Sequence, residues 1–282
     1  MAEINREHKD RLFKFIFGNP LNKEWTLSLY NAVNGSHYTD ASAIRLNTIQ
    51  DAVYMSMKND ISFLIGNTMN FYEQQSTFNP NMPMRFLIYS GMIYSKYVEE
   101  SKNYHKYSSK QQKAPTPKCI CFYNGTTDKE DMSILRLSDS FDSESDIEVK
   151  DTMININFGH NKELLEICKP LKEYSWFVYK IRSYQQTTET IDEAVDAALD
   201  EMPDDWLIKP FLMDNKAEVK SMCITEYDEE RTFAEQREEG RAEGVLETLF
   251  GLVKKGILTI SQAADEANMT ETEFIEKTGL KA

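Results

Sequence analysis

The stretch that decides the fold is NDISFLIGNTMNFYEQQS, residues 59–76. An apolar run ends at Ile65, and the two residues Gly66-Asn67 separate it from a second run that begins at Thr68. Glycine at the first position of a two-residue loop is typical of a tight β-hairpin turn. The sequence therefore predicts two antiparallel strands joined at Gly66.

The register of this hairpin places two acids opposite each other. If Ile65 pairs with Thr68, partner numbers sum to 133, and 133 − 60 = 73 sets Asp60 opposite Glu73. Like charges directly opposed in a sheet are destabilising, and a divalent cation between them would remove the conflict. Gln75 shares the face of Glu73, because side chains alternate along a strand. The hairpin thus predicts a candidate metal site.

Two other interpretations of the hairpin stay open. The two acids could be polar residues on a solvated face, or a protonated pair without a metal. The register also depends on the loop length, because a three-residue loop would shift the pairing and separate the acids.

Composition bounds the class of protein. The chain has 282 residues, of which 41% are hydrophobic and 11% aromatic, enough for a packed core. It has no run of about 18 apolar residues and begins without an apolar signal segment, so neither a membrane span nor secretion is expected. The spacing of its four cysteines fits neither a paired zinc motif nor a disulfide framework. We therefore expect a reducing, cytoplasmic setting.

Charge is unevenly distributed along the chain. The net charge of −14 argues against nucleic acid as a default partner. Residues 101–118, however, carry five lysines and no acid, whereas residues 189–205 carry eight acids and no base. The lysine-rich segment, punctuated by two prolines, predicts a loop and is the place where phosphate contact could occur.

The order of predicted elements indicates an α/β protein with a mixed sheet. Periodicity predicts helices near 7–17, 22–33 and 83–104, with strands at the hairpin, at 119–123, at 133–137 and at 152–158. From residue 160 onward the pattern is helical. We expect one domain over 1–215, a polar connecting helix over 216–256, and a small helical segment over 257–282.

The sequence resembles the Rpn family of recombination-promoting nucleases and putative transposases, in the PD-(D/E)XK nuclease superfamily. Four motifs carry the resemblance, in this order: DRLFKFIFG at 10–18, Asn59-Asp60, YEQQ at 72–75, and MRFLIY at 84–89. The run PKCICFYNG at 117–125 and the glycine-spaced EGRAEG at 239–244 are weaker pieces. The match covers residues 10–125 well and the remainder thinly.

The resemblance implies an αβββαβ core, a helical C-terminal extension and Mg²⁺-dependent hydrolysis of DNA phosphodiesters, with Mn²⁺ as an alternative ion. It makes Asp60 and Glu73 the metal ligands and Gln75 a third catalytic residue. Gln75 stands where the superfamily has lysine; its amide has no charge but can orient a water or contact phosphate. A further acid from the first helix would be Asp10 or Glu24.

Contacts to the DNA backbone are expected from four basic residues. Arg85 lies in the first turn of the helix after the hairpin, where its guanidinium either binds phosphate or forms a salt bridge with an acid such as Glu73. Lys106, Lys110 and Lys113 come from the lysine-rich segment. Tyr89, one turn after Arg85, is interpreted as a packing residue.

Two function classes remain. The first is an active DNA endonuclease that acts in recombination, transposition or defence. The second is a catalytically silent relative that serves as a binding module, an alternative kept open by Gln75 and by the acidic composition. In either class the C-terminal helices are candidates for self-association.

Overall fold

The computed structural model describes residues 12–46, 60–101, 104–105 and 107–279. Six strands form one mixed sheet, β1 (Arg45–Leu46), β2 (Ile61–Ile65), β3 (Thr68–Gln75), β4 (Thr116–Tyr123), β5 (Met132–Arg136) and β6 (Lys150–Asn155). Their order across the sheet is β1-β2-β3-β4-β6-β5. The strands β3, β4 and β6 run parallel, and the other neighbours pair antiparallel. The expectation of an α/β protein with a mixed sheet is confirmed.

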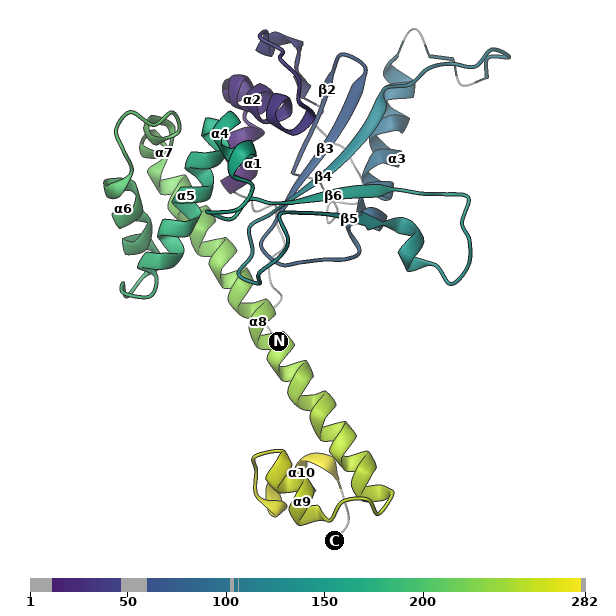
Figure 1. The fold of residues 1–282 in the computed structure, drawn as a ribbon, viewed down its shortest axis with the longest axis vertical. Coiled ribbons are helices and arrows are strands. Elements are labelled where there is room, and N and C mark those ends of the chain that lie inside the picture. Colours follow the sequence, from purple (N-terminus) through teal and green to yellow (C-terminus); the bar gives the residue numbers. More distant parts are fainter. Residues whose placement is uncertain (1–11, 47–59, 102–103, 106, 280–282) are drawn as a thin grey trace. The chain divides into compact units, whose positions relative to one another are not determined.

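Helices cover both faces of this sheet (Figure 1). The helices of the first part of the chain are α1 (Leu12–Phe17), α2 (Lys23–Asn34), α3 (Met82–Glu100), α4 (Lys162–Ile167), α5 (Lys169–Tyr184), α6 (Ile191–Glu201) and α7 (Lys209–Asp214), of which α6 packs against α5. One face packs against α1, α2 and α5 in the larger core, which includes Phe13, Tyr72 and Phe122. The other face packs against α3 in a smaller core around Phe71 and Phe86.

The hairpin has the predicted register. Ile65 pairs with Thr68 and Ile61 with Tyr72, so partner numbers sum to 133 along β2 and β3. Gly66 has a φ of 55°, a conformation that a type II′ turn requires at its first central residue. Glu73 and Gln75 are buried. The alternative interpretation, that the acids of the hairpin are polar residues on a solvated face, is therefore wrong for Glu73.

Some predicted boundaries were wrong. Residues 116–118, assigned to the loop, are the first residues of β4, because β3 extends to Thr68 and provides a partner for Thr116. The helix α3 ends at Glu100 and not at 104, and the last strand runs over 150–155 and not over 152–158. Predicted elements that fall in 1–11 or 47–59 lie outside the described residues.

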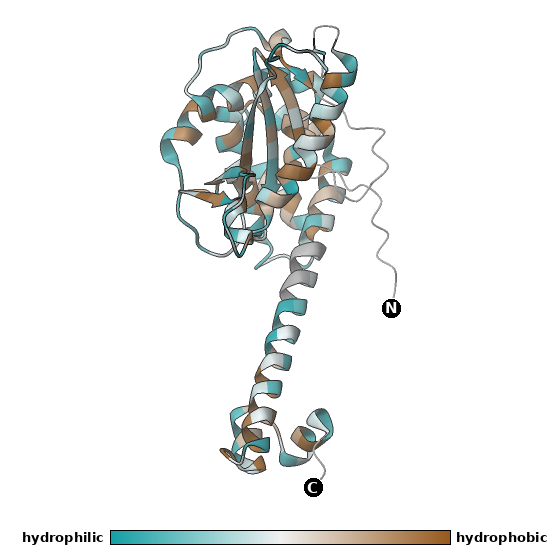
Figure 2. Ribbon diagram, turned by 90° about the vertical axis from the view of Figure 1, so that its right-hand side faces the viewer, coloured by the Kyte–Doolittle hydropathy of each residue, from teal (hydrophilic) through white to brown (hydrophobic). Residues whose placement is uncertain are grey.

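The C-terminal region is helical. The helix α8 (Lys216–Lys254) has 39 residues and is followed by α9 (Ile260–Glu266) and α10 (Glu271–Thr278), each of which begins with a capping box. The chain forms two compact units, 1–226 and 227–282, each with its own apolar core. Beyond the first unit α8 is mostly pale or teal in the hydropathy view, whereas the strands are largely brown (Figure 2). Among the described helices, none is both long and apolar enough to cross a membrane.

Candidate functional site

The two acids of the hairpin meet at the end of the β2–β3 ladder. Asp60 lies one residue before β2 and opposite Glu73, which continues the register of the hairpin. The Asp60 backbone N–H donates to Glu73 Oε2 at 3.2 Å, and the Gln74 backbone N–H donates to Asp60 Oδ2 at 2.7 Å. Each carboxylate therefore binds the backbone of the facing strand, and this exchange fixes both side chains at one place.

Arg85 completes the cluster from the helix α3. Its Nη2 atom lies 2.5 Å from Glu73 Oε1, which forms the salt bridge that the sequence left as one of two alternatives. Glu73 is only 2% exposed, so the guanidinium neutralises a carboxylate that water barely reaches. Burial opposes the charge on Arg85, but Glu73, Tyr89 and Asp60 outweigh it, so the pKa of Arg85 is raised. Arg85 is thus a permanent cation in the site.

Tyr89 has a polar role that sequence reasoning missed. Its hydroxyl accepts hydrogen bonds from Arg85 Nε at 3.0 Å and from Arg85 Nη2 at 2.8 Å. Burial and the nearby Glu73 raise the pKa of Tyr89 to about 12, so the hydroxyl keeps its proton at neutral pH. The signal was present in the sequence, because residues four apart on a helix are neighbours on its surface.

Gln75 faces the same helix. It lies two residues after Glu73 on the same face of β3, and its amide Nε2 approaches Met82 Sδ at 2.7 Å. Arg85 Nη1 approaches the same sulfur at 3.4 Å. We call Asp60, Glu73, Gln75, Arg85 and Tyr89 the carboxylate cluster.

Two of the three predicted lysines, Lys110 and Lys113, lie away from this cluster. Lys110 and Lys113 are exposed in the loop that leads into β4, whose first residue pairs with the first residue of β3. Glu73 is five positions further along β3, roughly 16 Å at 3.3 Å per residue. Lys106 lies outside the described residues, as does Asp10. Glu24 is on α2, which packs on the opposite face of the sheet.

A buried acid that was not predicted lies in the same layer as the cluster. Asp151 on β6 pairs with Cys119, shares the α3 face and is fully buried. Burial raises its pKa to about 7, and the Cys121 backbone N–H opposes this without reversing it. Neither carboxylate oxygen has a hydrogen bond of normal geometry among the described residues. Alternation along the strand predicts the face of Asp151 but not its neighbours.

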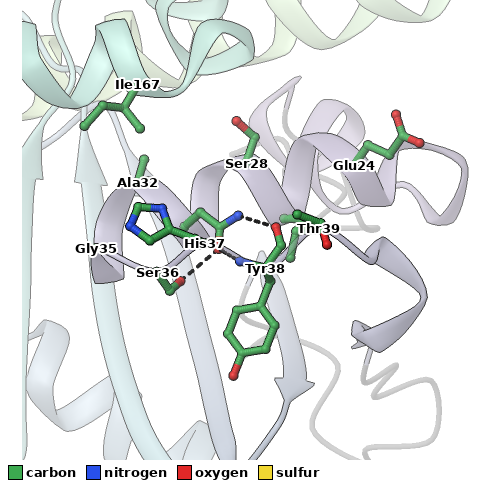
Figure 3. Close-up of a pocket in the computed structure, with 11 residues that line it drawn as sticks. Glu24, Ser28, Ala32, Gly35, Ser36, His37, Tyr38, Thr39 and Ile167 are labelled. Carbon is green, nitrogen blue, oxygen red and sulfur yellow. Dashed lines mark hydrogen bonds between the residues drawn. The ribbon is translucent and has the colours of Figure 1, made fainter.

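A separate pocket of about 480 Å³ lies along α2 (Figure 3). Its lining includes Glu24, Ser28 and His37, with Ile167 at the edge. Much of its polar surface is used internally, because Asn31 accepts from Ser36 Oγ and from the Tyr38 backbone N–H and donates to the Tyr38 carbonyl. These bonds hold the loop after α2 against the helix.

The cluster offers two carboxylates to a metal ion. Mg²⁺ binds oxygen ligands and keeps several waters, so one or two carboxylates with a substrate phosphate satisfy it. Asp60 and Glu73 fit that requirement. The described residues contain no group of three or more His, Cys, Asp or Glu side chains that could hold a metal ion.

No family model, curated protein or solved structure matches this chain.

Proposed function

We propose that this protein is a metal-dependent DNA endonuclease of the PD-(D/E)XK type, related to the Rpn family. The observation that carries the proposal is the convergence of Asp60 and Glu73 at the end of a hairpin whose register follows from the sequence. The order α1–β1–β2–β3–α3–β4, with α2 inserted after α1, supports the finer assignment of an αβββαβ core.

The residues of the cluster have distinct roles in this proposal. Asp60 and Glu73 hold Mg²⁺, which when bound activates water and stabilises charge on the phosphate. Gln75 orients a water or contacts a phosphate oxygen through its amide. Arg85 supplies the positive charge that Gln75 lacks, and its guanidinium geometry suits phosphate oxygens. Lys106, Lys110 and Lys113 remain proposed backbone contacts for DNA that extends beyond the cluster.

Arg85 also sets a condition on metal binding. Its guanidinium already binds Glu73 Oε1, so a cation at Glu73 competes with it for that oxygen. Release of Arg85 toward a substrate phosphate would free the oxygen for the metal. Affinity for Mg²⁺ should therefore rise when DNA is present.

The proposal is tested with supercoiled plasmid and purified protein. We expect nicked or linear product in Mg²⁺ and a loss of roughly 100-fold or more in Asp60→Asn, because removal of several kcal/mol of stabilisation corresponds to at least that factor. The matched control is Asp142→Asn, which changes an exposed acid in the loop between β5 and β6. Cleavage by Asp60→Asn at the rate of the unchanged protein would refute the proposal.

The second candidate is a catalytically silent binding module. It is favoured by the salt bridge itself, because Arg85 satisfies Glu73 without any metal. Titration with Mn²⁺ separates the two. A nuclease should bind the ion in the presence of a short duplex and lose that binding in Asp60→Asn, whereas a silent module should show neither binding nor cleavage.

A further inference from the structure

The strand β5 is the outer strand of the sheet that the described residues form, with β6 as its neighbour there. Hydrogen bonds join Asn155 N–H to the Asp131 carbonyl and Leu137 N–H to the Val149 carbonyl, both at 2.9 Å. Because hydrogen-bonded pairs alternate along an antiparallel ladder, the odd residues of β5 bond to β6. Met132 and Ile134 therefore direct their N–H and C=O groups away from the sheet, toward the position of a seventh strand.

The side chains of this edge are apolar and exposed. Met132 is 55% exposed and Ile134 is 53% exposed, on the face that carries Ile154. Natural edge strands are usually protected by a lysine, a proline, a bulge or a very short length. The sequence MSILR of β5 has only its last residue charged, and all five residues pair in register with β6. The edge is thus open to strand addition.

A row of cations crosses the sheet beside this edge. Arg136 on β5 pairs directly with Lys150 on β6, and Lys118 lies beside Lys150 because the next residues, Cys119 and Asp151, are partners. All three side chains are exposed, and no ion pair joins any of them to another described residue. Like charges directly opposed across strands are destabilising. A negative charge next to Arg136 would relieve this repulsion.

The acidic loop between β5 and β6 does not provide that charge. Glu148 is its member nearest to Lys150 in sequence, and it instead accepts hydrogen bonds from Leu137 N–H and from the hydroxyl of Ser138. The three cations therefore remain without a negative partner among the described residues, although the chain has a net charge of −14 and the loop between β5 and β6 contains five acids.

We propose that β5 binds an extended segment of a partner protein as a seventh, antiparallel strand. The backbone edge supplies affinity, and the side chains set the sequence that fits. An acidic residue lies opposite Arg136, and apolar residues lie opposite Ile134 and Met132. In an antiparallel strand this order reads acidic-x-apolar-x-apolar. The interaction is independent of the carboxylate cluster, which lies on the other face of the sheet.

Two other occupants fit less well. A second copy paired through Ile134 would set Met132 opposite Arg136 of that copy, which leaves the cation row without negative charge. A nucleic acid would use the cations through its phosphates, but it would not use the backbone edge or the apolar side chains. The combination of edge, apolar pair and cation row favours an acidic peptide strand.

The test uses fluorescein-labelled peptides and the full-length protein, with fluorescence anisotropy as the readout. The probe SETVTVS has the proposed pattern, and SKTVTVS reverses its charge. We expect SETVTVS to bind at least tenfold more tightly than SKTVTVS, and Arg136→Glu to reverse that preference. Absence of SETVTVS binding up to about 1 mM would overturn the proposal.

Variants at Ile134 separate strand addition from simple charge attraction. Ile134→Pro removes an N–H that points outward and spares the ladder to β6, so the fold should persist and peptide binding should be lost. Ile134→Thr keeps the N–H and should weaken binding severalfold, which provides a second variant if the proline variant does not fold. The matched control is Ile147→Thr, which changes an equally exposed isoleucine outside β5 and should leave binding unchanged.

Three results would assign the edge differently and overturn the proposal. The first is peptide binding that neither Ile134→Pro nor Arg136→Glu changes. The second is self-association of the unchanged protein in sedimentation that Ile134→Pro abolishes, which would identify a second copy as the occupant. The third is tight binding of a labelled oligonucleotide that Arg136→Glu weakens and Ile134→Pro does not, which would identify nucleic acid.

Discussion

Single residues in the α3 face of the sheet differ in how their charges are satisfied. Glu73 has Arg85 as its partner, and Asp60 binds the backbone of β3. Asp151 is buried in the same layer with no hydrogen bond of normal geometry among the described residues. A charge without a partner in a buried site is costly, so Asp151 takes up a proton instead.

Asp151 should therefore make stability depend on pH. Its pKa is raised from 3.8 to about 7, so the folded chain binds more protons than the unfolded chain between these values. The contribution of Asp151 to the free energy of unfolding is therefore fully present below about pH 4 and is lost as the pH rises toward 7. The total loss is roughly 4 kcal/mol, at 1.36 kcal/mol per pKa unit.

Urea unfolding at pH 5 and pH 8 measures this effect. We expect Asp151→Asn to remove most of the difference between the two pH values, because asparagine does not titrate. Asp139→Asn, at an exposed site, serves as the control and should keep the difference. An unchanged pH dependence in Asp151→Asn would show that other groups cause it.

At the scale of elements, two glycines differ in whether the surrounding structure leaves room for a side chain. Gly125 follows β4, and a Cβ atom there would lie 2.0 Å from the Ser76 carbonyl oxygen, which is backbone. Gly240 lies in the middle of α8, where a Cβ atom would meet nothing within 4 Å. The first glycine permits a close approach of two chain segments, whereas the second only lowers helix propensity.

Alanine substitutions should separate the two cases. Gly125→Ala should destabilise the first unit by more than about 2 kcal/mol, because the backbone of Ser76 must shift. Gly240→Ala should stabilise α8 by up to about 1 kcal/mol. Urea unfolding followed by tryptophan fluorescence measures the first effect, and amide hydrogen exchange in α8 measures the second. Equal effects of the two substitutions would contradict the structural difference.

At the scale of the whole molecule, the second unit has a much smaller core than the first. The larger core of the first unit includes residues from α1 to α8. The core of the second unit is built on Leu249, Ala263, Ala264 and Phe274. A unit of 56 residues with so small a core is expected to be only marginally stable.

Phe274→Ala should therefore unfold the second unit and spare the first. Truncation of a buried phenylalanine typically costs 3–5 kcal/mol, roughly the stability available to so small a core. All three tryptophans, Trp25, Trp176 and Trp206, lie in the first unit. We expect the far-UV circular dichroism signal to fall at lower urea in the variant while the tryptophan fluorescence transition stays in place. A parallel shift of both signals would mean that the units unfold together.

The sequence alone determined the features that depend on local periodicity and turn chemistry. Gly66 fixed a two-residue loop, the loop fixed the register, and the register placed Asp60 opposite Glu73. The helix α2 and the left-handed Gly35 that ends it follow from the same kind of signal. Such features need only neighbours in sequence, because strand pairing across a short turn and helix capping are local interactions.

Only the tertiary structure decided which distant residues meet. The sequence alone left two partners open for Arg85, a phosphate or an acid. The packing of α3 on β3 brings Arg85 to Glu73. Parallel pairing of β4 with β6 buried Asp151 and aligned Lys118 with Lys150, which are 32 positions apart. No local pattern encodes these contacts, because strand order and helix placement set them through burial of the whole sheet.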